Sequence, residues 1–421
     1  MSKVIVVGAG PAGLLAGITA AQNGAEVIVI EKMRTPGKKL LITGKGRCNI
    51  TNSCDIAEMV KNIPGNGRFL HSVLRSFTNA DIIELLENSG VPTKVERGGR
   101  VFPVSDKAVD VLSALVRLLE SYGAQLITDT SVSGLLMQNQ TVTGVITSKG
   151  NYLADAVVLA AGGASYPAIG SDGSGFQIAQ KSGHTIIQPL PALVPIESDS
   201  EYIPELQGIS LKNVQASICC NNKVLAKEFG EMLFTHFGFS GPIILSLSKI
   251  IATHIYKNQE SLDLVIDLKP ALDAHKLDLR IQRDFNLYSR KQLINAMVDL
   301  LPGRLIQPVL DSAFLNPEKI VNQISKEERG RLGHTLKNLS FPITGTRPLR
   351  EAIVTAGGVA TTEINPKTMA SKVVDGLFLA GEVIDIDGYT GGYNLQAAYS
   401  TGVVAGKNAA LLGDIRSCSN D

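Results

Sequence analysis

The sequence predicts an α/β protein whose parallel sheet receives strands from both ends of the chain. A strand, a glycine-rich turn, a helix and a second strand follow one another within the first 31 residues. A further apolar strand at 376–380 precedes a second glycine-rich turn and a long helix. Strands that alternate with helices in this way are typical of parallel sheets covered by helices. At 421 residues, the chain is long enough for two or three domains.

The N-terminal segment carries a complete dinucleotide-binding fingerprint. Residues 3–7 form a β-branched strand, a helix runs to about Gln22, and a second strand at 26–30 leads to Glu31. The glycines allow a tight turn, close approach of a diphosphate and close packing of helix on strand. Glu31 follows the last glycine by 18 residues, which suits an acceptor for adenosine ribose hydroxyls. The turn residues expected to contact the cofactor are Gly8, Gly10, Pro11, Ala12 and Gly13.

A basic, glycine-rich segment at 37–52 follows the acid-bearing strand. Its closely spaced glycines around Arg47 favour backbone contact with a ligand over an ordinary solvated loop. We expect this segment to run along the cofactor toward its reactive ring. The contacts predicted here and in the neighbouring strands are Lys32, Lys38, Gly46, Arg47, Cys48, Asn49 and Val132.

Two later strands return the chain to the nucleotide-binding sheet. Residues 141–147 and 152–159 are predicted strands, and the second ends in a run of small residues at 160–163. Near the C-terminus, the strand at 376–380 is followed by an acid and, further on, by a helix at about 395–412. The cofactor contacts predicted in these segments are Ala161, Gly162, Gly381, Glu382, Gly392, Tyr393, Asn394 and Leu395.

The second glycine-rich helix start favours FAD over a nicotinamide dinucleotide. An acid at the strand end can hold ribityl hydroxyls. The positive end of a helix dipole can stabilise the negative charge that collects near N1 and O2 of a reduced flavin. The segment at 170–175, GSDGSG, lacks a preceding buried strand and a later acid, so we interpret it as a turn that lines the flavin site. A second dinucleotide-binding domain, dedicated to a nicotinamide cofactor, is therefore not expected.

Composition excludes several other classes of function. A formal charge of +1 gives no strong field for nucleic acid or an anionic membrane. The uncharged run at 4–25 is rich in glycine, which argues against a membrane span. Five cysteines are too few for a disulfide framework, which favours a reducing, cytoplasmic compartment. The six histidines show no metal-ligand spacing, so no metal site is expected.

Five long motifs resemble those of the BaiN and aminoacetone oxidase family of bacterial flavoproteins. They are VGAGPAGLLAG at 7–17, TGKGRCNITN at 43–52, GEMLFTHFGFSGP at 230–242, and ITGTRPLREAIVTAGGV from 343 with AGEVIDIDGYTGGYNLQAA from 380. The resemblance implies a discontinuous Rossmann-like FAD-binding domain of the glutathione-reductase type. It also implies two insertions, a β-barrel-like domain and a small helical domain. One departure is Lys45, which stands where the family pattern has glycine.

The sequence agrees with this organisation, since short strands alternate over 191–268 and helices dominate 271–337. The predicted segments are the first part of the FAD domain at 1–190, the barrel-like insertion at 191–270, the helical insertion at 271–337, a return through the barrel at 338–349, and the second part of the FAD domain at 350–421.

Two oxidoreductase hypotheses follow. In the first, a small amine of the aminoacetone kind transfers hydride to flavin N5 and dioxygen reoxidises the flavin. In the second, NAD(P)H binds transiently and the flavin saturates an enone-like substrate. The absence of a second fingerprint favours the first.

Two further interpretations receive less support. Cys48 and Cys54 suggest a flavin disulfide reductase, but their spacing differs from that class. A non-catalytic flavoprotein that binds RNA or a protein partner would suit the charged helix at 326–337, but that segment mixes both signs of charge and lacks aromatic residues.

Catalytic side chains are hard to identify, because the flavin carries the difficult chemical step. The candidates are Arg47, for a substrate carboxylate or phosphate, His236, facing the cavity from the barrel, and Tyr166 and Tyr393, capping the cavity.

Overall fold

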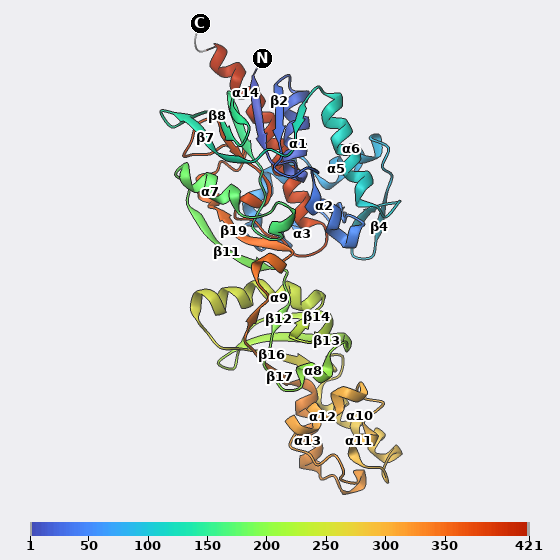
Figure 1. The fold of residues 1–421 in the computed structure, drawn as a ribbon. Coiled ribbons are helices and arrows are strands. Elements are labelled where there is room, and N and C mark those ends of the chain that lie inside the picture. Colours follow the sequence, from blue (N-terminus) through green and yellow to red (C-terminus); the bar gives the residue numbers. More distant parts are fainter. Residues whose placement is uncertain (1, 419–421) are drawn as a thin grey trace. The chain divides into compact units, whose positions relative to one another are not determined.

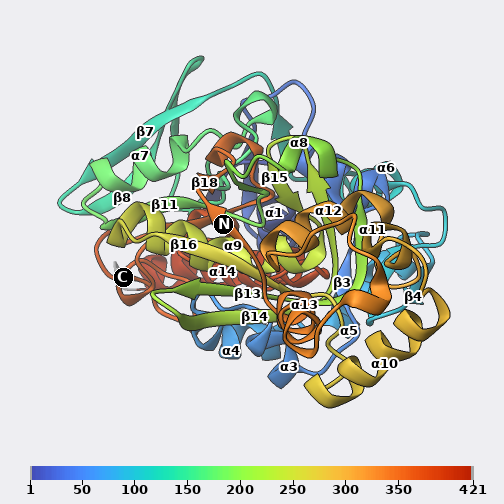
Figure 2. The ribbon, with the colours of Figure 1, turned by 90° about the horizontal axis from the view of Figure 1, so that it is seen from below.

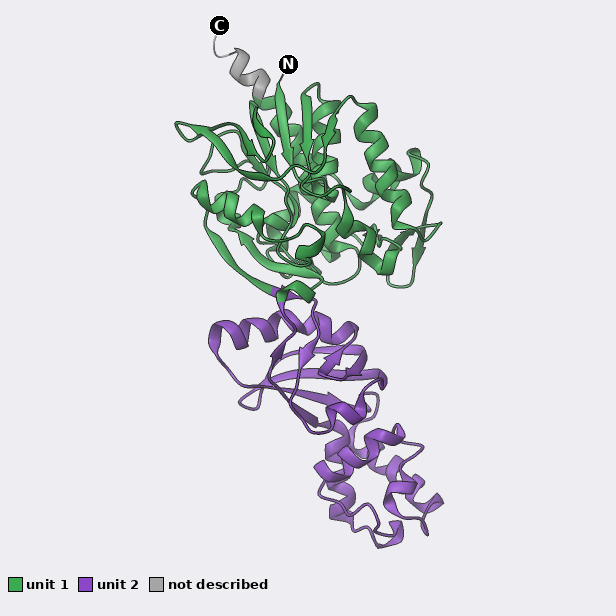
Figure 3. Cartoon of the chain, in the orientation of Figure 1, with its two compact units in different colours: residues 1–190, 349–421 green, residues 191–348 purple. Residues whose placement is uncertain are grey.

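The computed structural model describes residues 2–418, and the side chains of these residues up to 412. The last three residues of the predicted FAD domain and the side chain of Cys418 therefore lie outside the described part. The chain divides into two compact units, which Figure 3 colours separately. The first unit contains residues 1–190 and 349–421, and the second contains residues 191–348.

A parallel five-stranded sheet forms the centre of the first unit (Figure 1). Its strands, in sheet order, are β20 (Leu377–Leu379), β10 (Ala156–Leu159), β1 (Lys3–Val7), β2 (Glu26–Ile30) and β6 (Gln125–Ile127). Nearly every residue of β1, β2 and β10 is buried, as expected of strands covered on both faces. The sheet thus joins strands from both ends of the chain, as predicted.

The predicted strand at 152–159 is wrong, because the structure divides it in two. Residues Gly150–Leu153 form β9 at the edge of an antiparallel meander, with β7 (Val132–Gln138) and β8 (Thr141–Thr147). The chain then turns at Asp155, whose side chain accepts a hydrogen bond from the Lys3 amide at 2.7 Å. This contact starts the buried strand β10 beside β1. The change from mostly exposed residues in β9 to buried ones in β10 marks the boundary.

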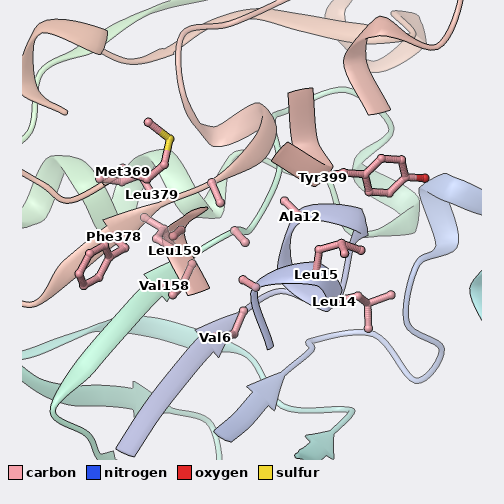
Figure 4. Packing of buried hydrophobic residues seen from close by; sticks show 14 of the residues in the cluster. Val6, Ala12, Leu14, Leu15, Val158, Leu159, Met369, Phe378, Leu379 and Tyr399 are labelled. Carbon is pink, nitrogen blue, oxygen red and sulfur yellow. The ribbon is translucent and has the colours of Figure 1, made fainter. Parts of the chain in front are cut away.

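Two helices, α1 (Pro11–Gln22) and α14 (Tyr393–Cys418), pack closely against each other. Glycines permit this contact, because a β-carbon at Gly402 would lie 2.3 Å from the carbonyl oxygen of Ala12. A β-carbon at Gly406 would lie 2.1 Å from the carbonyl oxygen of Ala16. Figure 4 shows the adjoining core, in which apolar side chains of the sheet and of α1 lie near Tyr399 of α14.

The remaining elements of the first unit cover the sheet and extend its carboxyl edge. The helices are α2 (Lys38–Ile42), α3 (Ile56–Lys61), α4 (His71–Ser76), α5 (Asn79–Asn88), α6 (Ala108–Ser121) and α7 (Ser174–Lys181). The small sheets are β3 (Thr51–Asn52), β5 (Arg100–Pro103) and β4 (Thr93–Glu96), and β11 (Ile186–Ala192) with β19 (Val354–Val359).

The second unit contains one seven-stranded antiparallel sheet, in which β16, β13 and β14 run side by side (Figure 2). Its strands, in sheet order, are β17 (Leu339–Ile343), β16 (Leu262–Asp267), β13 (Ser210–Cys220), β14 (Lys223–Thr235), β15 (Gly238–Ser240), β12 (Ile196–Glu197) and β18 (Gly345–Thr346). Helix α9 (Pro242–Thr253) packs on β14, where a β-carbon at Gly230 would lie 2.9 Å from Ile243.

Short helices complete the second unit. They are α8 (Ile203–Leu206), α10 (Ala274–Leu287), α11 (Leu293–Ala296), α12 (Gly303–Ser312) and α13 (Lys326–Lys337). Asp273 caps the start of α10, and Ser325 with Glu328 forms a capping box at α13. These helices share one apolar core with the sheet, and the division of this unit into separate barrel-like and helical domains stays a prediction.

Within residues 2–418, no helix has both the length and the apolar character needed to span a membrane. The uncharged run at 4–25 instead forms β1, the glycine-rich turn and α1.

Candidate functional site

The turn between β1 and α1 has the geometry of a diphosphate cradle. Gly8 has φ 100°, and a β-carbon there would lie 2.6 Å from the carbonyl oxygen of Ala160. A β-carbon at Gly13 would lie 1.8 Å from the carbonyl oxygen of Gly8. At Gly10 it would meet no protein atom within 4 Å. Two glycines are therefore required by packing, and the third keeps space open beside the helix start.

Glu31 is held at the carboxyl end of β2 by two backbone amides. Its Oε2 accepts a hydrogen bond from the Ala9 amide at 2.8 Å, and its Oε1 accepts one from the Met33 amide at 2.9 Å. Each carboxylate oxygen retains acceptor capacity for a hydroxyl group. The Thr130 amide donates to the Glu31 carbonyl oxygen at 3.0 Å, so the start of β7 at Val132 lies near this acid.

The first residues of α1 and α14 lie at different levels along the axes of these two parallel helices. Gly402 faces Ala12 and Gly406 faces Ala16, so the two helices run parallel. In this register α14 begins eight residues before the level of Pro11, which at 1.5 Å per residue is about 12 Å. An extended ribityl chain with its flanking bonds spans roughly 9 Å. One helix start can therefore serve a diphosphate while the other serves a flavin ring.

Segment 49–52 anchors the N-terminus of α14. With the Asn49 amide oriented to satisfy its neighbours, its oxygen accepts a hydrogen bond from the Gly392 amide at 3.0 Å. Asn52 donates to the Gly391 carbonyl oxygen at 3.1 Å, and Thr51 donates to Gln396 Oε1 at 2.6 Å. Residues more than 300 positions apart are thus joined, and the basic segment contacts the start of α14, while its course along a cofactor stays a prediction.

The side chain of Asn394 forms hydrogen bonds with the loop that precedes α14. Its Oδ1 accepts from the Gly388 amide and its Nδ2 donates to the Gly388 carbonyl oxygen, both at 2.8 Å. A cofactor contact at this helix start is therefore predicted for the first-turn backbone N–H groups of Tyr393, Asn394 and Leu395, which have no acceptor within the helix. No acidic residue stands in the first turn of α1 or α14, so their positive ends remain available for an anion.

Glu382 lies in a polar cluster that the sequence did not indicate. Lys39 donates to Glu382 Oε2 and to Ser165 Oγ, each at 2.7 Å. The Thr355 amide donates to Glu382 Oε1 at 2.8 Å. The sequence analysis did not name Lys39, and the cofactor contact that it assigned to the neighbouring Lys38 stays a prediction. The predicted contacts Ala161, Gly162 and Gly381 follow the carboxyl ends of β10 and β20, beside this cluster.

Lys32, a predicted cofactor contact, is paired with the GSDGSG turn. Its ammonium group donates to Asp172 Oδ1 at 2.6 Å and to Ser174 Oγ at 3.1 Å. Although burial opposes the shift, hydrogen bonds from Lys32 and Ser174 lower the pKa of Asp172. The GSDGSG turn, which follows β10 in the sequence, is therefore bound to the segment after β2 through Lys32.

Arg47 is already neutralised by its neighbours. Its guanidinium group pairs with Glu96 and, at 2.8 Å, with Asp106, and it lies 4.0 Å from the centre of the Phe102 ring. Hydrogen bonds from Lys94 and Arg47 lower the pKa of Asp106. The network joins two cations and two carboxylates, which leaves little net charge for the substrate anion that the sequence analysis assigned to Arg47.

The loop around Arg47 contains two residues other than glycine in the left-handed region. Lys45 has φ 60° and Cys48 has φ 61°. Glycine adopts this left-handed conformation without the steric cost of a β-carbon, which agrees with the glycine that the family resemblance implies at position 45. Gly46 is exposed, with φ 87°, and only one protein atom lies within 4 Å of a β-carbon built there.

The cysteine pair does not have the properties of a redox disulfide. Cys48 and Cys54 are both free, and Cys48 is fully buried. Burial raises the pKa of Cys48 to about 12, so its thiol stays protonated at neutral pH. These findings argue against the disulfide reductase hypothesis.

The remaining catalytic candidates stay predictions. Tyr393 is buried, and burial raises the pKa of its hydroxyl group. Tyr166 is partly buried, with φ 61°, just before the turn at 167–169. His236 is exposed in the second unit, between β14 and β15, with its ring centre 4.9 Å from that of Phe237.

The chain matches, over residues 2–408, the family described as HI0933-like protein Rossmann domain. It is 32% identical over 417 residues to the 3-dehydro-bile acid delta(4,6)-reductase of Clostridium scindens, covering 97% of this chain and 99% of that protein. It is 32% identical over 407 residues to the ribosomal RNA dihydrouridine synthase of Haemophilus influenzae, covering 95% of this chain and 96% of that protein.

Solved structures support the fold. A 3-ketosteroid-delta4-(5alpha)-dehydrogenase from Rhodococcus jostii has a TM-score of 0.51 at 16% identity, covering 97% of both chains. A flavocytochrome c3 fumarate reductase has a TM-score of 0.51 at 18% identity, covering 98% of this chain and 78% of that chain. At these identities the two likenesses concern the fold alone, while the open cradle at Gly10 and the two displaced helix starts fit a bound FAD. The chain belongs to the HI0933-like Rossmann-domain family, the flavoprotein family that its motifs resemble, and is an FAD-dependent oxidoreductase.

Proposed function

We propose that this protein reduces a carbon–carbon double bond conjugated to a carbonyl group. The support comes from two relatives that match the whole chain. The first is named as a delta(4,6)-reductase of a 3-dehydro, that is 3-keto, bile acid. The second is named as a synthase of dihydrouridine, which is uridine with the ring double bond next to a carbonyl group saturated. The two substrates share an α,β-unsaturated carbonyl group, which is the enone-like chemistry of the second hypothesis.

The observation that carries the cofactor part of the proposal is the displacement of about 12 Å between the starts of α1 and α14. Residues of the first turn of α1 would bind the diphosphate, and Glu31 would accept hydrogen bonds from the ribose. The first N–H groups of α14 would face the flavin ring and stabilise negative charge on it. Bound FAD supplies hydride transfer at N5.

The proposed reaction needs an external reductant, for which we propose NAD(P)H. In the balanced reaction, NAD(P)H, a proton and the unsaturated carbonyl compound give NAD(P)⁺ and the saturated carbonyl compound. The hydride adds to the β-carbon and the proton to the α-carbon. The chain has one dinucleotide fingerprint, so NAD(P)H would bind only during reduction.

Amine oxidation with dioxygen is the competing hypothesis, and one anaerobic experiment separates the two. The purified yellow protein is mixed with NADH, with NADPH or with aminoacetone while flavin absorbance is followed. We expect bleaching by a reduced pyridine nucleotide and rapid recovery on addition of a steroid 4-en-3-one, a 4,6-dien-3-one, or a uridine-containing rRNA fragment. The compound that restores the flavin colour shows whether the conjugated carbonyl group of the substrate belongs to a steroid or to RNA. Bleaching by the amine alone, with recovery only in air, would contradict the proposal.

A further inference from the structure

The sheet order places the fingerprint turn between two segments that contact each other. Strand β1 lies between β10 and β2, and all three strands run parallel. Their carboxyl ends therefore lie along one edge, in the order Ala160, Gly8 and Glu31. A contact between the segments that follow β10 and β2 must pass the end of β1, where the diphosphate cradle lies.

Segment 170–175, the GSDGSG turn, makes such a contact. Lys32, directly after Glu31, donates to Asp172 at 2.6 Å and to Ser174 at 3.1 Å. A β-carbon at Gly170 would lie 3.0 Å from Met33, so the backbone of the turn touches the segment after β2. These contacts attach one side of the turn to the ribose end of the site.

The other side of the turn is attached to the segment after β10. The Gly173 amide donates to the Gly163 carbonyl oxygen at 3.0 Å. A β-carbon at Gly175 would lie 3.0 Å from the side chain of Ala161. The turn is thus fixed on both sides, by backbone contacts near β10 and by the ammonium–carboxylate pair near β2.

Ser171, the second residue of this turn, has a buried hydroxyl group without a hydrogen-bond partner among the described residues. Its oxygen would lie 3.5 Å from a β-carbon at Gly162, a predicted cofactor contact. Buried polar groups are almost always paired, and an unpaired one is costly. The position is therefore incomplete in the protein alone, which is consistent with a further partner brought by the cofactor.

We propose that segment 170–175 is a strap across the diphosphate and adenosine-ribose part of the bound FAD, closed by the Lys32–Asp172 pair. Lys32 and Asp172 act as positioning residues, since they hold the strap instead of contacting the phosphates. The strap slows release of the cofactor, because the pair must separate before the diphosphate can leave. This inference rests on the FAD binding of the proposed function and not on its substrate.

The test measures FAD release from the holoenzyme, followed as the rise in flavin fluorescence after dilution. Asp172→Asn is expected to speed release about tenfold and to weaken its dependence on salt, because a screened ion pair is removed. Lys32→Asp should speed release similarly, and the double reversal Lys32→Asp with Asp172→Lys should restore slow release.

A matched control is Asp267→Asn in the second unit, which removes the Lys337–Asp267 pair of the same length, 2.6 Å. This change should leave the release rate unaltered. Unchanged release in Asp172→Asn, or a double reversal that folds but releases FAD as fast as Lys32→Asp, would overturn the strap. A protein that releases FAD slowly but reduces no conjugated carbonyl compound would overturn the proposed substrate class alone.

Discussion

Gly402 lies so close to Ala12 that a β-carbon at 402 would stand 2.3 Å from the Ala12 carbonyl oxygen. This contact joins the helix of the N-terminal fingerprint to the last helix of the chain. It fixes their register, and the register fixes how far apart the two helix starts lie. The separation of a diphosphate site from a ring site thus depends on two glycines of α14, at 402 and 406.

Substitution of these glycines tests that register. Gly402→Ala and Gly406→Ala should each cost roughly 1–3 kcal/mol of stability, because the methyl group meets backbone that cannot move aside. Flavin release on heating should shift to a lower temperature. Gly330→Ala in α13 is the control, since a β-carbon there meets no protein atom within 4 Å. That change should be neutral or stabilising by up to about 1 kcal/mol. Wild-type thermal release in both α14 variants would contradict the tight contact.

Glu31→Gln should weaken FAD binding about tenfold, which corresponds to about 1.4 kcal/mol. The amide of glutamine can replace only one of the two acceptor oxygens that hold the Ala9 and Met33 amides. Titration of the apoprotein with FAD gives the dissociation constant. Glu26→Gln, at the exposed amino end of the same strand, should bind FAD like the wild type. Equal affinities for the two variants would remove Glu31 from the proposed site.

Lys39→Met should also lower FAD affinity, by roughly threefold to tenfold, because Glu382 and Ser165 lose their shared donor. The same titration measures the effect. Lys61→Met is the matched control, since the Lys61–Glu58 pair is exposed and such pairs contribute little. If Lys39→Met matches this control, the cluster around Glu382 does not support the cofactor.

The sequence predicted the fingerprint region closely, because its signals are local. The strands at 3–7 and 26–30 and the helix ending at Gln22 all agree with the structure. The strand at 152–159 was wrong, since apolar runs do not show whether a chain changes sheets at Asp155. The contact between Lys39 and Glu382 was missed for a similar reason. Only the fold shows which of two adjacent side chains reaches Glu382, 343 positions away.

The ion-pair partners of Arg47 and Lys32 could not be predicted from the sequence either. Arg47 was a candidate for a substrate anion until the fold brought Glu96 and Asp106 beside it. The GSDGSG turn was predicted to line the flavin site, but its ion pair with Lys32 depends on the order of β10, β1 and β2 in the sheet. Spacing along the chain contains neither piece of information.

The buried thiol of Cys48 predicts a loss of stability in alkali. Because its pKa in the folded protein is about 12, above the ordinary value of 9.0, its stabilising contribution is complete below pH 9. The contribution is then lost as the pH rises from 9 toward 12, with a slope of about 1.4 kcal/mol per pH unit. Urea unfolding of the wild type and of Cys48→Ser at pH 8 to 11 measures the difference in slope. Parallel pH profiles, or rapid alkylation of native Cys48 at pH 8, would show that the thiol is not buried as described.

The most direct test of the shared flavin site is a crystal structure of the yellow protein with FAD bound. The diphosphate should accept hydrogen bonds from the Ala12 and Gly13 amides, and the pyrimidine edge of the ring should lie at the first amides of α14. A flavin whose diphosphate binds at Gly10 but whose ring lies away from residues 392–395 would contradict the account.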